Sequence, residues 1–221
     1  MYEMIPILLG VLMMGMGVFM AAEPEKAAKK ELRENENELK KVRKSGFVMI
    51  VCGIGKVSAA MSTQALIDLY KPEKIINFGT AGGANDNINI ISLYLIDKCC
   101  QYDFDLSELD GCSVGYMCDY DRIYYICDVD KLDFLPKTSL CTADRFSNKV
   151  SDINIVNMLG CSLRDMEGAA IAQVATSNGL PFVCFKGITD TYNHPATEFY
   201  ENKKRVCALF PAAVETLVKN I

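Results

Sequence analysis

The chain has 221 residues, of which 50% are hydrophobic and 23% are charged, and its formal net charge is −5. This length suits one α/β domain with a full hydrophobic core, and the composition excludes a disordered or fibrous protein. The acidic balance excludes general nucleic-acid binding, because that function needs a basic surface.

Ten cysteines are spread along the chain without a Cys-x-x-Cys pair, and His194 is the single histidine. This combination gives no support to a zinc finger or to a thioredoxin-like redox site. The cysteines lie in apolar runs such as FVMIVCG and LPFVCFKG. We therefore expect the cysteines to be small buried core residues of a protein in a reducing, cytoplasmic compartment. We expect no metal and no cofactor.

The N-terminal run from Ile5 to Ala22 contains no charged residue. Its length is at the lower limit of a membrane span, and a signal peptide is a second interpretation. Both are disfavoured because the preceding flank holds Glu3 and no basic residue, and because Pro6 and three glycines interrupt the run. A third interpretation is a buried first strand that follows a hydrophobic extension.

The rest of the chain alternates between apolar runs and helical patterns, with a less regular stretch over 98–150. Buried strands are expected at 47–53, 74–83, 88–97 and 181–187. Helices are expected at 23–45, 57–70, 167–178 and 197–220. This alternation predicts an α/β fold with a largely parallel sheet, in which ligands bind at the carboxyl ends of the strands.

Three expected strand ends carry candidate site residues, namely GTAGG at 79–83, RDMEG at 164–168 and GITDT at 187–191. A glycine-rich turn lets backbone amides approach a ligand closely. Glu167 is suited to accept hydrogen bonds from vicinal hydroxyls, although an acid at a helix start is the alternative. Asp190, if it is buried after its strand, would hold a proton near neutral pH; a capping aspartate is the alternative.

The order of motifs along the chain resembles the nucleoside phosphorylase and nucleosidase superfamily, and within it the 5′-methylthioadenosine/S-adenosylhomocysteine nucleosidases. The motifs are MAAEPE, GIGKVSAA, INFGTAGG, QYDFD, TADRF, RDMEGAAIA and FKGITD. The resemblance covers the chain from about Val18 to its C-terminus. It implies a three-layer α/β/α sandwich around a mixed, largely parallel sheet, as in the nucleoside phosphorylases.

The resemblance implies hydrolysis of the N-glycosidic bond of 5′-methylthioadenosine and S-adenosylhomocysteine, with release of adenine. By position, Glu25 matches the glutamate that activates the attacking water, and Asp190 matches the aspartate that protonates N7 of adenine. Glu167 matches the ligand of the ribose hydroxyls, with Met166 packed on the sugar, and Phe146 matches the residue stacked on adenine. The other expected substrate-binding residues are Ile54, Thr80, Ala81, Gly82, Asp165, Lys186 and Thr189.

The resemblance also implies a homodimer, because members of the family complete the pocket with residues of the partner subunit. Leu106 and Leu109 are the candidates for that wall. It makes Gly15–Met20 the first strand, which leads to Glu25, so we do not expect export, and membrane contact is disfavoured. One catalytic domain over 14–221 then follows an apolar extension over 1–13.

Three features depart from the family pattern: Thr80 stands in place of a serine, Lys186 in place of an arginine, and the segment between Glu25 and Gly53 is short. Two alternatives stay open. One is a phosphate-dependent phosphorylase of the same fold, or a hydrolase of a related nucleoside such as a futalosine, although no Gly/Arg pair near 21–30 would hold phosphate. The other is a non-catalytic nucleoside-binding protein.

Overall fold

The computed structural model describes residues 9–13, 47–193 and 197–220. The strands are β1 Leu9–Met13, β2 Phe47–Val51, β3 Lys74–Gly83, β4 Leu93–Gln101, β5 Tyr125–Ile126, β6 Lys137–Thr142, β7 Leu163–Asp165 and β8 Phe182–Thr191. The helices are α2 Lys56–Tyr70, α3 Ser107–Asp110, α4 Val150–Met158, α5 Gly168–Ser177, α6 Thr197–Cys207 and α7 Phe210–Asn220, with a short 3-10 turn at Cys118–Tyr120.

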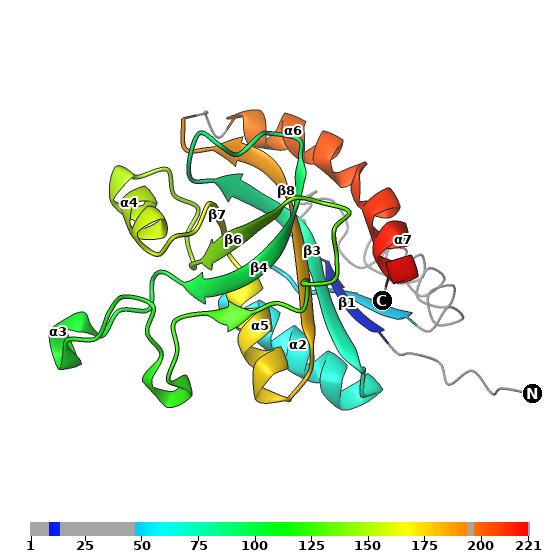
Figure 1. The fold of residues 1–221 in the computed structure, drawn as a ribbon, viewed down its shortest axis with the longest axis horizontal. Helices are drawn as coiled ribbons and strands as arrows, with labels where there is room; N and C mark the ends of the chain where they lie inside the picture. Colours follow the sequence, from blue (N-terminus) through cyan, green and yellow to red (C-terminus); the bar gives the residue numbers. More distant parts are fainter. Residues whose placement is uncertain (1–8, 14–46, 194–196, 221) are drawn as a thin grey trace, which may run out of the picture.

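The strands form one eight-stranded mixed sheet between two layers of helices (Figure 1). Helices α2 and α5 lie side by side on one face, and α6 and α7 cover the other. Among the described strands, five of the eight pairings are parallel. The expected α/β/α arrangement around a mixed sheet is therefore confirmed.

Five strands of this sheet close into a ring. Strand β3 pairs with β8, β8 with β4, β4 with β6, β6 with β7, and β7 returns to β3. Strands β1 and β2 extend the sheet from β3 in parallel. Because β3 and β8 are buried along nearly their whole length, they form the centre of the fold. Phe78 and Phe185 stack there at 5.3 Å, and Phe210 of α7 packs against both rings.

A bulge interrupts the pairing of β3 with β8. Ala81 is opposite Ile188 but Gly82 is opposite Asp190, so Thr189 is an extra residue in β8. In a regular strand, residues four apart point to the same face. The extra residue instead sends Lys186 and Asp190 to opposite faces, and they pair with Asp165 and Arg164, which are neighbours in β7.

The first three expected elements after residue 46 are found within two or three residues of their expected limits. The strand expected at 88–97 begins later, at Leu93, because 85–92 form a turn in which Ile91 has φ 60°. The expected closing helix divides at Leu209 into α6 and α7. Two elements were not expected: strand β6, within the irregular stretch, and helix α4, which begins where that stretch ends.

The N-terminal predictions have a mixed outcome. The helix over 23–45, the strand Gly15–Met20 and the residue Glu25 lie outside the described residues. Within the segment expected to be an extension, Leu9–Met13 pairs with both β2 and β3. The division into an extension and one domain stays a prediction. No helix in the described ranges has the length and apolar character to cross a bilayer.

Candidate active site

A cavity of about 240 Å³ lies at the carboxyl ends of β3 and β8, where the end of β7 also arrives. Nine of the expected site residues line it: Ile54, Thr80, Ala81, Gly82, Phe146, Asp165, Met166, Thr189 and Asp190. Three further lining residues, Arg145, Arg164 and Phe199, were not expected. The three strand ends singled out from the sequence therefore meet at one cavity.

Asp190 is held in place from two sides and is only 1% exposed. Its Oδ1 accepts a hydrogen bond from the Thr189 hydroxyl at 2.8 Å, and its Oδ2 accepts one from Nη2 of Arg164 at 3.1 Å. Burial raises the pKa of Asp190, although the Thr189 hydrogen bond and the Arg164 charge oppose that rise. The side chain is thus a candidate proton donor with a fixed orientation.

Gly82 provides the space that this arrangement needs. A Cβ atom there would lie 2.9 Å from Oδ2 of Asp190 and 3.1 Å from Nη2 of Arg164. Both distances are shorter than ordinary van der Waals contact with carbon. The GTAGG segment, which was expected to be a turn, is the end of β3. A glycine is needed at position 82 because it leaves room for the Asp190–Arg164 pair, and not because the backbone has a positive φ there.

Arg164 connects the buried carboxylate to the aromatic wall of the cavity. Its guanidinium donates to Oδ1 of Asn148 at 2.5 Å and to the Ser147 carbonyl, and it lies 5.9 Å from the centre of the Phe146 ring. Phe146 is 53% exposed and meets Phe199 edge to face at 5.7 Å. An exposed aromatic wall beside a buried acid suits a planar, apolar base with nitrogen acceptors.

Sequence reasoning missed Arg164 although it lies inside the RDMEG motif. The available signal is its position next to Asp165. Neighbouring residues of a strand point to opposite faces, but at the end of a strand both can line the same site. Arg145 and Phe199 had weaker signals. Phe199 comes from α6, far along the chain, and no local pattern connects it to Phe146.

Asp165 and Lys186 form an ion pair at 2.9 Å in which both side chains are fully buried. Oxygens of Asp165 also accept hydrogen bonds from the Thr142 hydroxyl at 2.5 Å and from the Gly168 amide at 2.8 Å, at the start of α5. Burial lowers the pKa of Lys186, but the Asp165 carboxylate outweighs it, and the net pKa is raised. Lys186 does not line the cavity, so its contact with the site is through Asp165.

Glu167 lies at the N-terminus of α5 and is fully buried. Its Oε1 accepts a hydrogen bond from the Gly55 amide at 2.9 Å, whereas Oε2 has no hydrogen-bond partner among the described residues. Burial, aided by the nearby Asp165 charge, raises the pKa of Glu167 to about 7. Its neighbour Met166 lines the cavity and Glu167 does not. A buried oxygen without a partner is suited to a ligand hydroxyl.

The GIGK turn is fixed by two acidic side chains. Glu167 binds its Gly55 amide, and Oδ1 of Asp144 accepts from the Lys56 amide at 2.7 Å. The Lys56 ammonium reaches Asp103 at 2.6 Å, which ties the turn to the QYDFD segment. Ile54 therefore presents its side chain to the cavity from a turn that is anchored on both sides.

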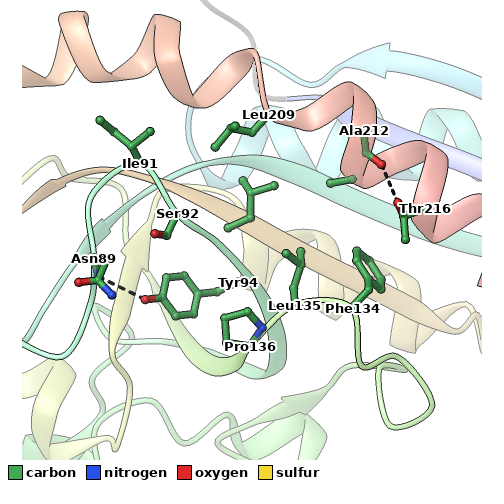
Figure 2. A pocket seen from close by; sticks show the side chains of 12 residues that line it. Asn89, Ile91, Ser92, Tyr94, Phe134, Leu135, Pro136, Leu209, Ala212 and Thr216 are labelled. Carbon is green, nitrogen blue, oxygen red and sulfur yellow. Dashed lines mark hydrogen bonds between the residues drawn. The ribbon is translucent and has the colours of Figure 1, made fainter.

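A larger cavity of about 520 Å³ lies elsewhere, between the start of β4, residues 134–136 and α7 (Figure 2). Its lining includes Tyr94, Phe134, Leu135, Pro136 and Leu209 and contains no charged side chain. It therefore lacks groups for acid–base chemistry. The smaller cavity, which is lined by two aspartates and two arginines, is the candidate active site.

The superfamily model described as "Phosphorylase superfamily" matches residues 11–219 of this chain. The chain therefore belongs to the phosphorylase superfamily, the class that its mixed sheet and its strand-end cavity define.

Within this superfamily, the 5′-methylthioadenosine/S-adenosylhomocysteine nucleosidase of Buchnera aphidicola is 32% identical over 94% of this chain and 97% of its own length. The chain is a member of the 5′-methylthioadenosine/S-adenosylhomocysteine nucleosidase family. The nucleosidase of Streptococcus pneumoniae, solved with 8-aminoadenine, has a TM-score of 0.76 and 23% identity, with 96% of this chain and 99% of that chain covered. Futalosine hydrolase of Helicobacter pylori also has a TM-score of 0.76, at 17% identity, with 96% and 97% covered.

Proposed function

We propose that this protein is a hydrolase that cleaves the N-glycosidic bond of 5′-methylthioadenosine and S-adenosylhomocysteine and releases adenine. The observation that carries the proposal is the buried Asp190, fixed by Thr189 and Arg164 beside the exposed ring of Phe146. The family relationship supports the same chemistry.

Cleavage of this bond builds positive charge on the ribose and negative charge on the departing base. In the proposed reaction, Asp190 donates its proton to N7 of adenine, and the base then leaves as a neutral molecule while Phe146 contacts its ring. The raised pKa of Asp190 suits this role, because an acid must keep its proton until the bond breaks. The logic parallels that of glycosidases, in which one carboxyl serves the leaving group and another serves water.

The other half of the reaction is the addition of water to the ribose carbon. We assign the activation of this water to Glu25 because of its place in the MAAEPE motif. Glu167 would accept hydrogen bonds from the ribose hydroxyls through its unpartnered Oε2, with Met166 against the sugar. The water proton passes to Glu25 and its hydroxide to the ribose, so the reaction requires neither phosphate nor a cofactor.

The decisive test is a panel of nucleosides assayed for free base with phosphate omitted. The panel contains 5′-methylthioadenosine, S-adenosylhomocysteine, adenosine and a 6-oxopurine nucleoside of the futalosine type. We expect adenine release from the first two. Release that requires phosphate would identify a phosphorylase, preference for the 6-oxopurine would identify a futalosine-type hydrolase, and binding without turnover would identify a nucleoside-binding protein.

We also propose that the protein is a cytoplasmic homodimer. Helix α3 projects away from the body of the molecule (Figure 1), and its Leu109 is 81% exposed. An exposed leucine on a projecting segment is suited to enter the pocket of a partner subunit, and Leu106 precedes the same helix. The free cysteines suit a reducing compartment.

Light scattering after gel filtration tests the dimer. We expect Leu109→Asp to weaken it and to raise KM for 5′-methylthioadenosine. The matched control is Leu69→Asp, a change of another exposed leucine, on α2. A monomeric wild-type protein with full activity would contradict the dimer proposal without affecting the proposed chemistry.

A further inference from the structure

Three cysteine side chains converge beneath α4, although they are far apart in the sequence. Cys100 lies in β4, Cys141 lies in β6, and Cys161 precedes β7. The Sγ atom of Cys100 is 3.4 Å from that of Cys141 and 3.9 Å from that of Cys161. All three sulfur atoms lie within 4.8 Å of one another. The proposed hydrolysis uses none of them.

This cluster lies on the side of the strands that faces away from α5. The residues that follow Cys100 and Cys141 are Gln101 and Thr142, and these face α5: Gln101 donates to Gln173 at 2.7 Å, and Thr142 accepts from the Ala169 amide at 2.9 Å. Because strand side chains alternate, the two thiols point the other way. There they pack with Cys161 among apolar side chains that include Ile153, Val156 and Leu159.

The spacing of the sulfur atoms matches that of thiolates on a single metal ion. With metal–sulfur bonds of about 2.3 Å and tetrahedral angles, two sulfur ligands are about 3.8 Å apart. The separations of 3.4 Å and 3.9 Å lie on either side of this value. A disulfide would use only two of the thiols and would leave the third without a function.

We propose that Cys100, Cys141 and Cys161 form a binding site for one thiophilic cation of the zinc(II) or copper(I) type. Soft thiolate ligands in an apolar setting select these ions. On binding of a divalent ion, three metal–sulfur bonds form, three S–H bonds break and the three thiol protons leave to solvent, so the bound cluster carries one net negative charge.

One positively charged side chain lies beside the cluster. The ammonium group of Lys98 lies 4.3 Å from the ring centre of Tyr124, next to the cluster. Tyr124 in turn donates to the Leu159 carbonyl at 2.8 Å. One cation near the cluster therefore offsets part of the negative charge that binding would leave there.

Titration of the reduced, metal-free protein with cadmium(II) tests the proposal, because cadmium–thiolate bonds absorb in the near ultraviolet. We expect a band that saturates at one equivalent, proton release in weak buffer, and displacement by zinc(II) or copper(I). Cys161→Ala should lower the affinity at least about a hundredfold, since even supporting residues around a metal change affinity by 10–100-fold. Cys184→Ala, a change of another fully buried cysteine outside the cluster, should leave the affinity unchanged.

The wild-type titration alone can overturn the proposal, so the result does not depend on the folding of a variant. Failure to saturate at one equivalent, or equal affinity in wild type and in Cys161→Ala with unchanged circular dichroism, would overturn it. Isolation of a Cys100–Cys141 disulfide that binds no cation after reduction would do the same. None of these outcomes depends on nucleoside hydrolysis, so the two proposals fail separately.

Discussion

Replacement of Glu167 by Gln should make the protein more stable and less active. Burial raises the pKa of this carboxyl from 4.5 to about 7, so the folded state opposes its ionisation. At about 1.4 kcal/mol for each pKa unit, the full difference corresponds to an upper limit of about 3.5 kcal/mol. Burial of the carboxyl, together with the nearby Asp165 charge, is the structural origin of this cost.

The effect has a defined pH dependence. Below pH 4.5 the carboxyl is protonated in both states and contributes nothing to their difference. Between pH 4.5 and about 7 the native state keeps the Glu167 proton while the unfolded state releases it, so the native state binds more protons and stability falls as pH rises. Glu167→Gln removes this pH-dependent contribution to stability. The free energy of unfolding gained by the substitution should therefore be small at pH 4.5 and approach its limit at pH 8.

Urea unfolding at pH 4.5 and pH 8 measures the gain in stability, and adenine release measures the loss of activity. Hydrogen bonds to charged groups contribute about 1.5–3 kcal/mol, which predicts a fall in kcat/KM of about tenfold to a hundredfold. Glu215→Gln is the control, because Glu215 is exposed on α7 and pairs with Lys219. A Glu167→Gln protein that is no more stable at pH 8 than at pH 4.5, relative to wild type, would refute the reasoning.

Three further changes test the site. Asp190→Asn should lower kcat about 10²–10⁴-fold with unchanged circular dichroism, because the general acid is lost; near-normal adenine release would contradict its role. Gly82→Ala places a Cβ 2.9 Å from Asp190 and should lower kcat/KM at least about tenfold in the same assay, and full activity would show that the pair has room to move. Lys186→Met leaves Asp165 buried without its partner and should cost about 3–5 kcal/mol in urea unfolding, whereas Lys74→Met, at a more exposed pair, should cost under about 1 kcal/mol. Equal losses in these two variants would contradict the ion-pair argument.

Much of the fold followed from local signals in the sequence. The apolar run FVMIVCG and the run KIINFGTAGG predict β2 and β3 because continuous burial on both faces leaves no polar positions. Strand β6 was missed because Lys137 and Thr138 precede its buried part, so its hydrophobic segment is short. The break between α6 and α7 was missed because the helical pattern continues through Leu209.

The candidate site was predictable where one motif carries both the residue and its place. Thr80, Ala81, Gly82 and Asp190 belong to strand ends, and strand ends meet at one edge of such a sheet. The contact of Arg164 with Asp190 was not predictable, because it depends on a bulge that changes which face each side chain uses. The cluster of three cysteines was likewise not predictable, since only the ring of strands brings residues 100, 141 and 161 together.

The extra residue at Thr189 also limits how this chain can change length. Removal of one residue between Lys186 and Asp190 would restore regular pairing with β3 and turn the acid to the face that Lys186 now occupies. Deletion of Gly187 or Ile188 would keep every site residue in the sequence and would still move Asp190 away from Arg164. We therefore expect insertions and deletions in related chains to accumulate outside this five-residue interval, whose length matters as much as its composition.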